Sequence, residues 1–182
     1  MNTVFLGPPG AGKGTQALLI SKRFRMRHIS TGELLREAIE KGNELGQKAR
    51  NHIDGGHLVP DDTMIDLIRK VLPSTGDFLL DGFPRTLNQA EALDEMLSTE
   101  RRKLDLAIYL DVSDEIAGQR LMGRHRADDR PETIRERLVV YHRETEPVVD
   151  YYGKTGRLRK IDASPPRERV TETISQELGA GK

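Results

Sequence analysis

The sequence contains no cysteine. Disulfide bonds and metal sites built on thiolates are therefore excluded, and a reducing compartment, the cytoplasm, is expected. No apolar run approaches the roughly 20 residues that a membrane-spanning helix needs. No charged segment precedes the first apolar stretch either. We therefore expect neither contact with a membrane nor a signal peptide.

The chain also lacks an excess of charge of either sign, because 29 Lys and Arg residues balance 29 Asp and Glu residues. Proteins bind nucleic acids mainly through excess positive charge, so we expect no nucleic-acid partner. A site for an anion must then come from local clustering of basic side chains. Repeats and low-complexity tracts are absent, and 182 residues fit one domain with small insertions.

Short apolar runs alternate with segments of helical periodicity. Strands are expected at residues 2–6, 27–29, 77–81, 104–112 and 158–163. Helices are expected at residues 14–24, from residue 30, at 60–72, 86–96, 113–123 and 132–152, and around 170–178. This alternation predicts an α/β fold with a mostly parallel sheet of about five strands and helices on both faces. Segments 40–60 and 124–131 are the least periodic, which predicts mobile inserts.

Ligands of such folds bind beyond the carboxyl ends of the strands. The site is therefore expected from residues 7–15, 30–36, 81–89, 112–124 and 162–165. Two local patterns indicate helix starts: Ser30 is followed three residues later by Glu33, a capping box, and Asp129 precedes Glu132 by the same distance. Whether Asp128 and Asp129 cap that helix or orient arginines stays open.

The stretch GPPGAGKGTQ, residues 7–16, matches G-x-x-x-x-G-K between a strand and a helix, the context that a phosphate-binding loop requires. Glycines let backbone N–H groups surround a phosphate, and the helix N-terminus and Lys13 add positive charge. A plain glycine-rich turn is the alternative interpretation. Gly14 occupies the place where the general motif has Ser or Thr, and the hydroxyl moves to Thr15.

Phosphoryl transfer between two nucleotides needs cations, in-line positioning and exclusion of water rather than a general base, since the attacking phosphate oxygen is already anionic. Arg120 and Arg124 lie four residues apart, hence on one helix face. Together with His125 and Arg126 they form a basic group with no acidic residue between them. A solvated basic patch is the alternative, which the neighbouring phosphate loop disfavours.

Three further residues fit the same chemistry. Arg137 on the next helix is able to point back toward the site, and Arg85 follows a buried strand. Asp81 ends that strand, where a carboxylate can orient the water molecules of Mg²⁺. A turn residue at a strand end is the other interpretation of Asp81.

Five segments resemble the adenylate kinase family in order and spacing from Met1 to about Ser164: GPPGAGKGTQ, HISTGELLREAI, GHLVPDD, LDGFPRTLNQA and GRHRADDRPETIRERLVVYHRET. GKGTQ resembles the nucleoside monophosphate kinases in general, in which glycine follows the lysine. The resemblance implies a P-loop kinase fold and the Mg²⁺-dependent reaction of ATP and AMP to two ADP, carried out by a monomer.

The resemblance also implies roles for individual residues. It implies that the phosphates of ATP are bound by the loop residues Gly10, Ala11, Gly12, Lys13, Gly14 and Thr15. Arg120 and Arg124 would cover ATP, and the backbone near Pro165 would contact its adenine. It implies that AMP is bound by Thr31, Arg36, His57, Leu58, Val59, Gly82, Phe83, Pro84, Arg85 and Gln89. Arg126 and Arg137 would bridge toward the transferred phosphate. The loop DASPP departs from the commoner glycine-containing loop, and His57 replaces a frequent lysine.

The resemblance divides the chain into a core of residues 1–29, 60–124 and 132–182, a monophosphate-binding insert at 30–59 and a short lid at 125–131. Long-type bacterial members carry an extra hairpin, sometimes with zinc, after the position of Arg124, and this chain has no room for one. It resembles the short-lid form, so we expect no structural zinc. Both inserts are expected to close over the ligands and keep water from the γ-phosphate.

The amide of Gln89 is able to donate to and accept from the edge of adenine, and Thr31 is larger than the residue usual in pyrimidine kinases. Both favour AMP over UMP or CMP, and a pyrimidine monophosphate kinase stays the alternative. A switch GTPase is disfavoured because no N-K-x-D-like stretch occurs. A structural domain with a decayed site is disfavoured because Lys13, Asp81 and the arginines occur together.

Overall fold

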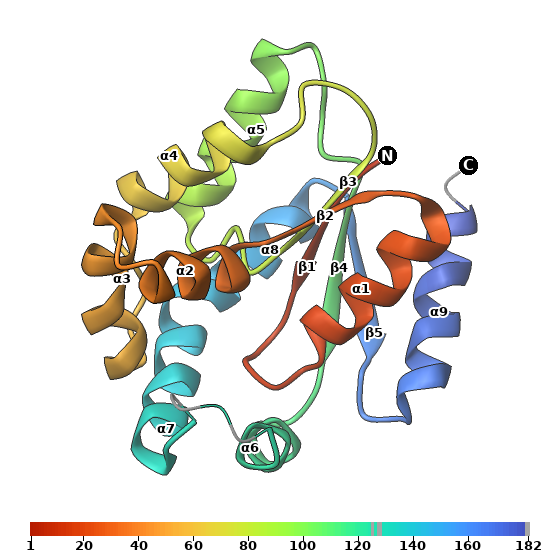
Figure 1. Cartoon of the computed structure of the whole chain (residues 1–182). Coiled ribbons are helices and arrows are strands. Elements are labelled where there is room, and N and C mark those ends of the chain that lie inside the picture. Colours follow the sequence, from red (N-terminus) through yellow and green to blue (C-terminus); the bar gives the residue numbers. More distant parts are fainter. Residues whose placement is uncertain (125, 127–128, 181–182) are drawn as a thin grey trace.

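The computed structural model describes residues 1–124, 126 and 129–180, and a five-stranded sheet forms its centre (Figure 1). The strand order is β2-β3-β1-β4-β5, and every neighbouring pair is parallel. The strands are β1 (Asn2–Leu6), β2 (Arg27–Ser30), β3 (Phe78–Asp81), β4 (Leu106–Asp111) and β5 (Leu158–Asp162). The predicted α/β fold with a parallel sheet is confirmed.

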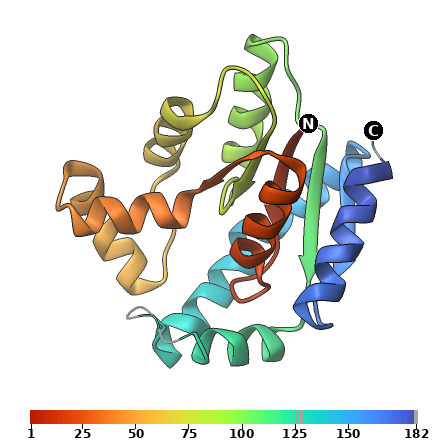
Figure 2. The ribbon, with the colours of Figure 1, turned by 45° about the vertical axis from the view of Figure 1, so that its right-hand side comes forward.

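Helices form the connections between the strands and cover both faces of the sheet. They are α1 (Lys13–Phe24), α2 (Thr31–Glu40), α3 (Glu44–Gly55), α4 (Asp61–Val71), α5 (Leu87–Thr99), α6 (Asp114–Met122), α7 (Pro131–Val140), the π-helix η1 (Tyr141–Thr145), α8 (Glu146–Lys154) and α9 (Arg167–Ala180). Figures 1 and 2 show α1 and α9 together on one side, while α5 and α8 lie on the other. None of the helices in the described part of the chain is long and apolar enough to cross a bilayer.

The core consists of two apolar layers, one on each face of the sheet. Successive side chains of a strand point to opposite faces. In β1, Val4 and Leu6 pack in the layer that contains Leu93 of α5, whereas Phe5 packs in the layer that contains Ile20 of α1. Burial on both faces explains why the inner strands β1, β3 and β4 are nearly continuous apolar runs, whereas the edge strands β2 and β5 are more polar. Each buried side chain of this size contributes about 1.5–3 kcal/mol to folding.

The segment 40–60, among the least periodic in the sequence, contains the helix α3 at Glu44–Gly55. Asn43 caps α3 by accepting a hydrogen bond from the backbone N–H of Gly46 at 2.9 Å, and Gly56 ends the helix with a φ of 79°. The buried residues of α3 are Gly46 and Ala49. Leu45, Ala49 and Ile53 follow one another at helical spacing and face the core, but only Ala49 of these three is fully buried.

The long helix expected at residues 132–152 is divided. The regular turns of α7 end at Val140, the π-helix η1 follows, and α8 carries Pro147 in its first turn. Proline has no backbone N–H, so the i to i−4 hydrogen-bond ladder is interrupted there. Periodicity alone continues through such a break and does not reveal it.

The capping box expected at Ser30 and Glu33 does not form. Ser30 is the N-cap of α2, but its side chain makes no cap hydrogen bond. Its hydroxyl instead lies 3.5 Å from Oδ2 of Asp81 and donates to it. The cause is the register of the sheet, in which Ser30 pairs with Asp81 at the carboxyl ends of β2 and β3.

Candidate active site

The phosphate-binding loop joins β1 to α1, as expected. The amine of Lys13, the first residue of α1, donates to the carbonyl oxygens of Gly7 at 2.7 Å and Pro8 at 2.9 Å. Gly10 has a φ of 88°, and a Cβ there would collide with the backbone of Ala117 in α6. Only glycine fits both requirements. The loop is therefore held by α6 as well as by its own strand and helix.

The environment of Lys13 is unusual for a lysine. Desolvation within the loop lowers the pKa of its amine to about 8. The nearby carboxylate of Asp81 acts in the opposite direction, and the guanidinium groups of Arg85 and Arg124 lower the pKa further. A bound polyphosphate would supply the negative charge that stabilises the protonated amine.

Asp81 ends β3 beside the start of α1, and it is largely buried. A Cβ on Gly14 would lie 3.2 Å from Oδ2 of Asp81, closer than an ordinary contact. A Ser or Thr side chain after Lys13 would therefore crowd this carboxylate. The glycine that departs from the general motif gives the carboxylate its room.

A cavity of about 610 Å³ lies beyond the carboxyl ends of the strands. Most of the predicted site residues line it: Gly10, Gly12, Lys13, Gly14, Thr15, Thr31, Arg36, His57, Leu58, Val59, Asp81, Gly82, Arg85, Gln89, Arg120, Arg124, Arg126 and Arg137. Pro84 lines a smaller adjoining cavity that shares Lys13, Gly82 and Arg85 with it. The structure thus brings together positions from well-separated parts of the chain.

Three predicted residues lie outside the walls of these cavities. Ala11 and Phe83 are buried among the apolar core residues. Pro165 follows β5, and its link to the site is indirect, since Nη2 of Arg120 donates to the carbonyl of Ser164 at 3.1 Å. The exposed imidazole of His57 faces Glu136 of α7, with Nδ1 3.5 Å from Oε1.

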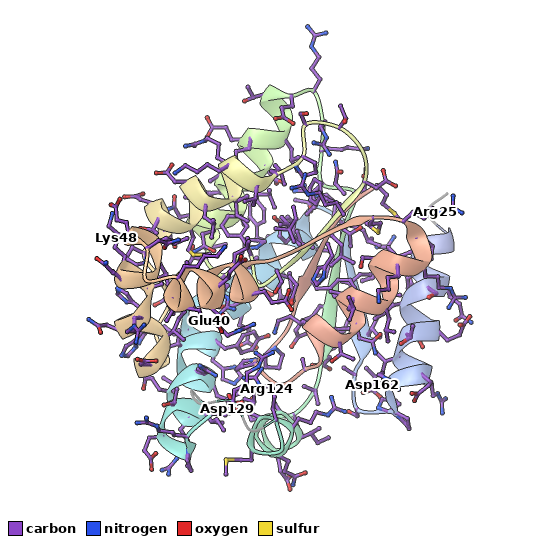
Figure 3. All side chains as sticks on the ribbon, viewed as in Figure 1. Arg25, Glu40, Lys48, Arg124, Asp129 and Asp162 are labelled. Carbon is purple, nitrogen blue, oxygen red and sulfur yellow. The ribbon has the colours of Figure 1, made fainter. Side chains whose placement is uncertain are left out.

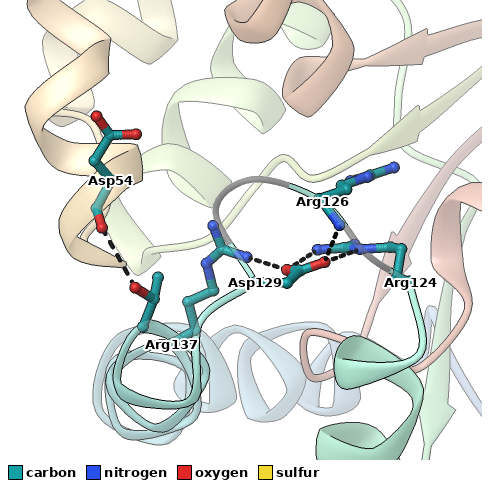
Figure 4. A network of polar contacts seen from close by, with 6 residues as sticks. Asp54, Arg124, Arg126, Asp129 and Arg137 are labelled. Carbon is teal, nitrogen blue, oxygen red and sulfur yellow. Dashed lines mark hydrogen bonds and ion pairs between the residues drawn. The ribbon is translucent and has the colours of Figure 1, made fainter.

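One buried carboxylate organises Arg124, which lies just after the end of α6, and Arg137 of α7 (Figure 4). The side chain of Asp129 is 1% exposed, and its two oxygens accept from Nε of Arg124 at 2.8 Å, from Nη2 of Arg124 at 2.6 Å and from Nη1 of Arg137 at 3.0 Å. The backbone N–H of Arg126 donates to it at 3.4 Å. Bidentate pairs of this kind fix both position and orientation.

This geometry answers the open question about Asp129. The N-cap of α7 is Arg130, followed by Pro131 at the first helical position, so Asp129 orients arginines. Figure 3 shows Arg124 and Asp129 close together between α6 and α7. No acidic residue lies between the members of the predicted basic group in the sequence, but the fold brings Asp129 into contact with Arg124. His125 and Asp128, also part of that prediction, lie outside the described residues.

The other end of the cavity has an apolar wall with a few polar groups. The hydroxyl of the buried Thr31 donates to the carbonyl of Asp81 at 3.3 Å. Gln89 is 1% exposed, and its side chain contacts Asp61 and the backbone of Arg85. Leu58 and Val59 of the apolar lining were predicted, whereas Leu35, Ile53 and Met64 were not.

Comparison with known proteins supports this geometry. The adenylate kinase family model matches residues 5–157. The chain belongs to the adenylate kinase family. It is 47% identical over 175 residues to an adenylate kinase of Corynebacterium urealyticum, covering 94% of this chain and 96% of the relative. It is 39% identical over 211 residues to an adenylate kinase of Methanothrix thermoacetophila, covering 98% of each chain.

Membership of the adenylate kinase family makes the protein a phosphotransferase and confirms the resemblance seen in the sequence. Two features of the site are established by the structure alone. One is the choice of Asp129 as an arginine partner, which the sequence left open. The other is the apolar wall to which Leu35, Ile53 and Met64 contribute.

The described residues of this adenylate kinase contain no group of three or more His, Asp or Glu side chains placed to hold a metal ion. Members of this family use ATP with Mg²⁺. Asp81 is suited to a supporting role at a Mg²⁺ site, since its carboxylate lies beside the phosphate loop. Its negative charge raises the pKa of Lys13, against the effect of burial. A cation bound to phosphates through oxygen and water matches this sparse donor set.

Proposed function

We propose that this protein transfers the γ-phosphoryl group of ATP reversibly to AMP, forming two ADP, with Mg²⁺. The observation that carries the proposal is the convergence of Lys13, Arg85, Arg124 and Arg137 on one cavity beyond the sheet. Two polyanionic nucleotides repel each other, and a set of cations in a desolvated cavity offsets that repulsion.

In this proposal the loop residues 10–15 and Lys13 hold the phosphates of ATP, and Arg120 and Arg124 cover them. Arg36 and Arg85 bind the phosphate of AMP, with Arg126 and Arg137 beside the transferred group. Mg²⁺ supplies charge neutralisation on the ATP phosphates, and Asp81 orients its water. The phosphate oxygen of AMP needs no general base, so positioning and charge carry the catalysis.

Asp129 has a particular part in this arrangement. Its single negative charge is shared between Arg124 and Arg137, so the group keeps a net positive charge, and it holds their guanidinium groups at the cavity that both residues line. Preorganised donors cost no reorganisation when charge develops in the transition state. We infer that Asp129 acts by positioning these donors and not by contact with the nucleotides.

We also propose the division into a core, a monophosphate-binding insert at 30–59 formed by α2 and α3, and a short lid at 125–131. The alignment with the Methanothrix relative is longer than this chain, so that relative contains residues without a counterpart here. This supports the short form, for which we propose a cytoplasmic monomer without structural zinc. Its partners are ATP, AMP and ADP.

The decisive experiment is a coupled assay for ADP with ATP plus AMP, UMP or CMP, each with and without Mg²⁺. We expect rapid ADP formation only with ATP, AMP and Mg²⁺ together. ATP hydrolysis that does not depend on a monophosphate would contradict the proposal. A pyrimidine monophosphate as the preferred acceptor would support the alternative kinase, which the relatives named adenylate kinase do not favour.

Replacing Thr31 tests the base side of the cavity. We expect Thr31→Ala to raise kcat/KM for UMP and CMP relative to AMP, because the smaller residue leaves space next to the base. Thr31→Ser is the matched control, since it keeps the hydroxyl that donates to the carbonyl of Asp81. Unchanged acceptor selectivity of Thr31→Ala in steady-state assays would refute this role.

A further inference from the structure

The side-chain amide of Gln89 is held in one orientation. Its Oε1 accepts from the backbone N–H of Arg85 at 2.8 Å, and its Nε2 donates to Oδ1 of Asp61 at 2.7 Å. A backbone N–H can only donate, and a carboxylate can only accept. If the oxygen and nitrogen of this amide were exchanged, the amide N–H would face the N–H of Arg85, and the amide oxygen would face the carboxylate of Asp61. Neither pair can form a hydrogen bond.

Asp61 is itself fixed at the junction of two helices. It is the first residue of α4, and its second oxygen accepts from the hydroxyl of Thr86 at 2.9 Å and from Nδ2 of Asn88 at 3.0 Å. Both of these partners lie at the start of α5, next to Gln89. The carboxylate is therefore anchored by two bonds besides the one to Gln89, and it cannot follow a rotating amide.

The held amide still has one hydrogen on Nε2 and one lone pair on Oε1 for a ligand. Gln89 lines the cavity, so these sites are available to a base seated against the apolar wall. Adenine presents a ring-nitrogen acceptor beside an exocyclic amino donor. Hypoxanthine and guanine present the reverse, a ring N–H beside a carbonyl. A freely rotating amide would match either pattern, whereas a held amide matches one.

We propose that Asp61 is a positioning residue for base selection: it fixes the amide of Gln89 so that the site accepts a 6-amino purine and rejects a 6-oxo purine. This inference rests on the proposed function, because it concerns the monophosphate acceptor of that reaction. The selectivity is then set by a carboxylate outside the contact with the base.

The unmodified protein gives the first test, with ATP and three acceptors: AMP, IMP and purine riboside 5′-monophosphate, which carries no group at position 6. Purine riboside 5′-monophosphate lacks one of the two hydrogen bonds that AMP can make. IMP would place its ring N–H against the amide N–H and its carbonyl against the amide oxygen, so it can make neither. We expect kcat/KM to fall in the order AMP, purine riboside 5′-monophosphate, IMP, with IMP at least roughly tenfold below the unsubstituted purine. IMP equal to or better than the unsubstituted purine would overturn the proposal.

The second test is Asp61→Asn, which keeps the shape of the side chain but is able to face either end of the Gln89 amide. We expect the ratio of kcat/KM for IMP to that for AMP to rise roughly tenfold or more. Asn88→Ala is the matched control, because it removes another partner of the same carboxylate and leaves the Gln89 bond; its ratio should stay unchanged. If Asp61 has a merely structural role, Asp61→Asn lowers kcat/KM for both substrates equally and leaves the ratio unchanged. That result would refute the inference. Absence of any AMP-dependent ADP formation by the unmodified protein would instead refute the proposed function.

Discussion

Lys13 illustrates how a single buried charge is linked to ligand binding. Desolvation lowers the pKa of its amine to about 8, and bound phosphates would raise it again. Below that pKa the amine is already protonated, so ATP binds without taking up a proton. Above it, the neutral amine must take up a proton from the solvent when ATP binds. The apparent affinity for ATP then falls by up to about tenfold per pH unit.

We therefore expect the binding of ATP with Mg²⁺ to take up almost no proton near pH 7 and close to one proton near pH 9. Calorimetric titrations in two buffers with different ionisation enthalpies measure this number directly. AMP alone is the control, since the amine of Lys13 lies at the phosphate loop. Equal proton uptake by ATP at both pH values would contradict the linkage.

Arg85 tests the role of the cations at the centre of the cavity. Its Nε donates to the carbonyl of Gly82 at 2.8 Å, which holds the guanidinium at the carboxyl end of β3. We expect Arg85→Ala to reduce turnover roughly 10²–10³-fold, as for the loss of a transition-state donor. Arg69→Ala, which removes an exposed pair on α4, is the control for general loss of charge. Near-normal turnover of Arg85→Ala with both nucleotides saturating would show that the donor is not needed.

At the residue scale, sequence reasoning identifies candidate residues where a local pattern marks them. The phosphate loop and the arginines are found from neighbours in the chain and from their charge. Asp61 and Gln89 are 28 residues apart, and their contact exists only once α4 and α5 are packed together. Asp129 was seen, but its choice between helix cap and arginine partner depends on where α7 begins.

At the scale of elements, the crossing of α2 and α3 shows why the insert has its sequence. A Cβ on Gly46 would overlap the backbone of Ala38 and Ile39, so the two helices approach as closely as glycine permits. Gly46 and Ala49 form the fully buried part of α3, and both side chains are small. The inner strands β1, β3 and β4 are apolar runs that are buried on both faces, so their signal in the sequence is strong, whereas the edge strands β2 and β5 carry polar and charged residues.

We expect Gly46→Ala to destabilise the protein by about 1–3 kcal/mol, because the added methyl group forces the helices apart. The insert lines the monophosphate side of the cavity, so KM for AMP should rise more than KM for ATP. Gly118→Ala in α6 is the control: nothing lies within 4 Å of its added Cβ, and alanine favours the helix by up to about 1 kcal/mol. Thermal unfolding and steady-state assays give both quantities. Equal stability of the two variants would rule out the tight crossing.

At the scale of the whole molecule, the insert is in contact with the helix that carries Arg137. The hydroxyl of Thr133 in α7 donates to the carbonyl of Asp54 in α3 at 3.4 Å (Figure 4). In addition, His57 faces Glu136. We therefore expect closure over AMP and closure over ATP to be coupled through these contacts. The parallel sheet could be predicted from the alternation of elements, but this contact between two separate segments could not.

We expect a two-substrate analogue, with two adenosines joined by a phosphate chain, to slow amide hydrogen exchange in α2, α3 and α7 more than in α9. At a concentration 100 times its Kd, the analogue should also stabilise the fold by about 2.7 kcal/mol. Adenosine without phosphates is the control. Stabilisation with no change of exchange in α3 and α7 would mean that binding does not close the site.

The parallel sheet also separates the two ends of the chain from the nucleotides. The amino group of Met1 is paired with Asp77, at the amino ends of β1 and β3, and the last turn of α9 lies on the same side in Figure 1. The phosphate loop and the arginines occupy the opposite rim. An affinity tag, a fluorescent reporter or a surface attachment at either end would leave the entrance for nucleotides open, so the protein is suited to immobilised and fused formats.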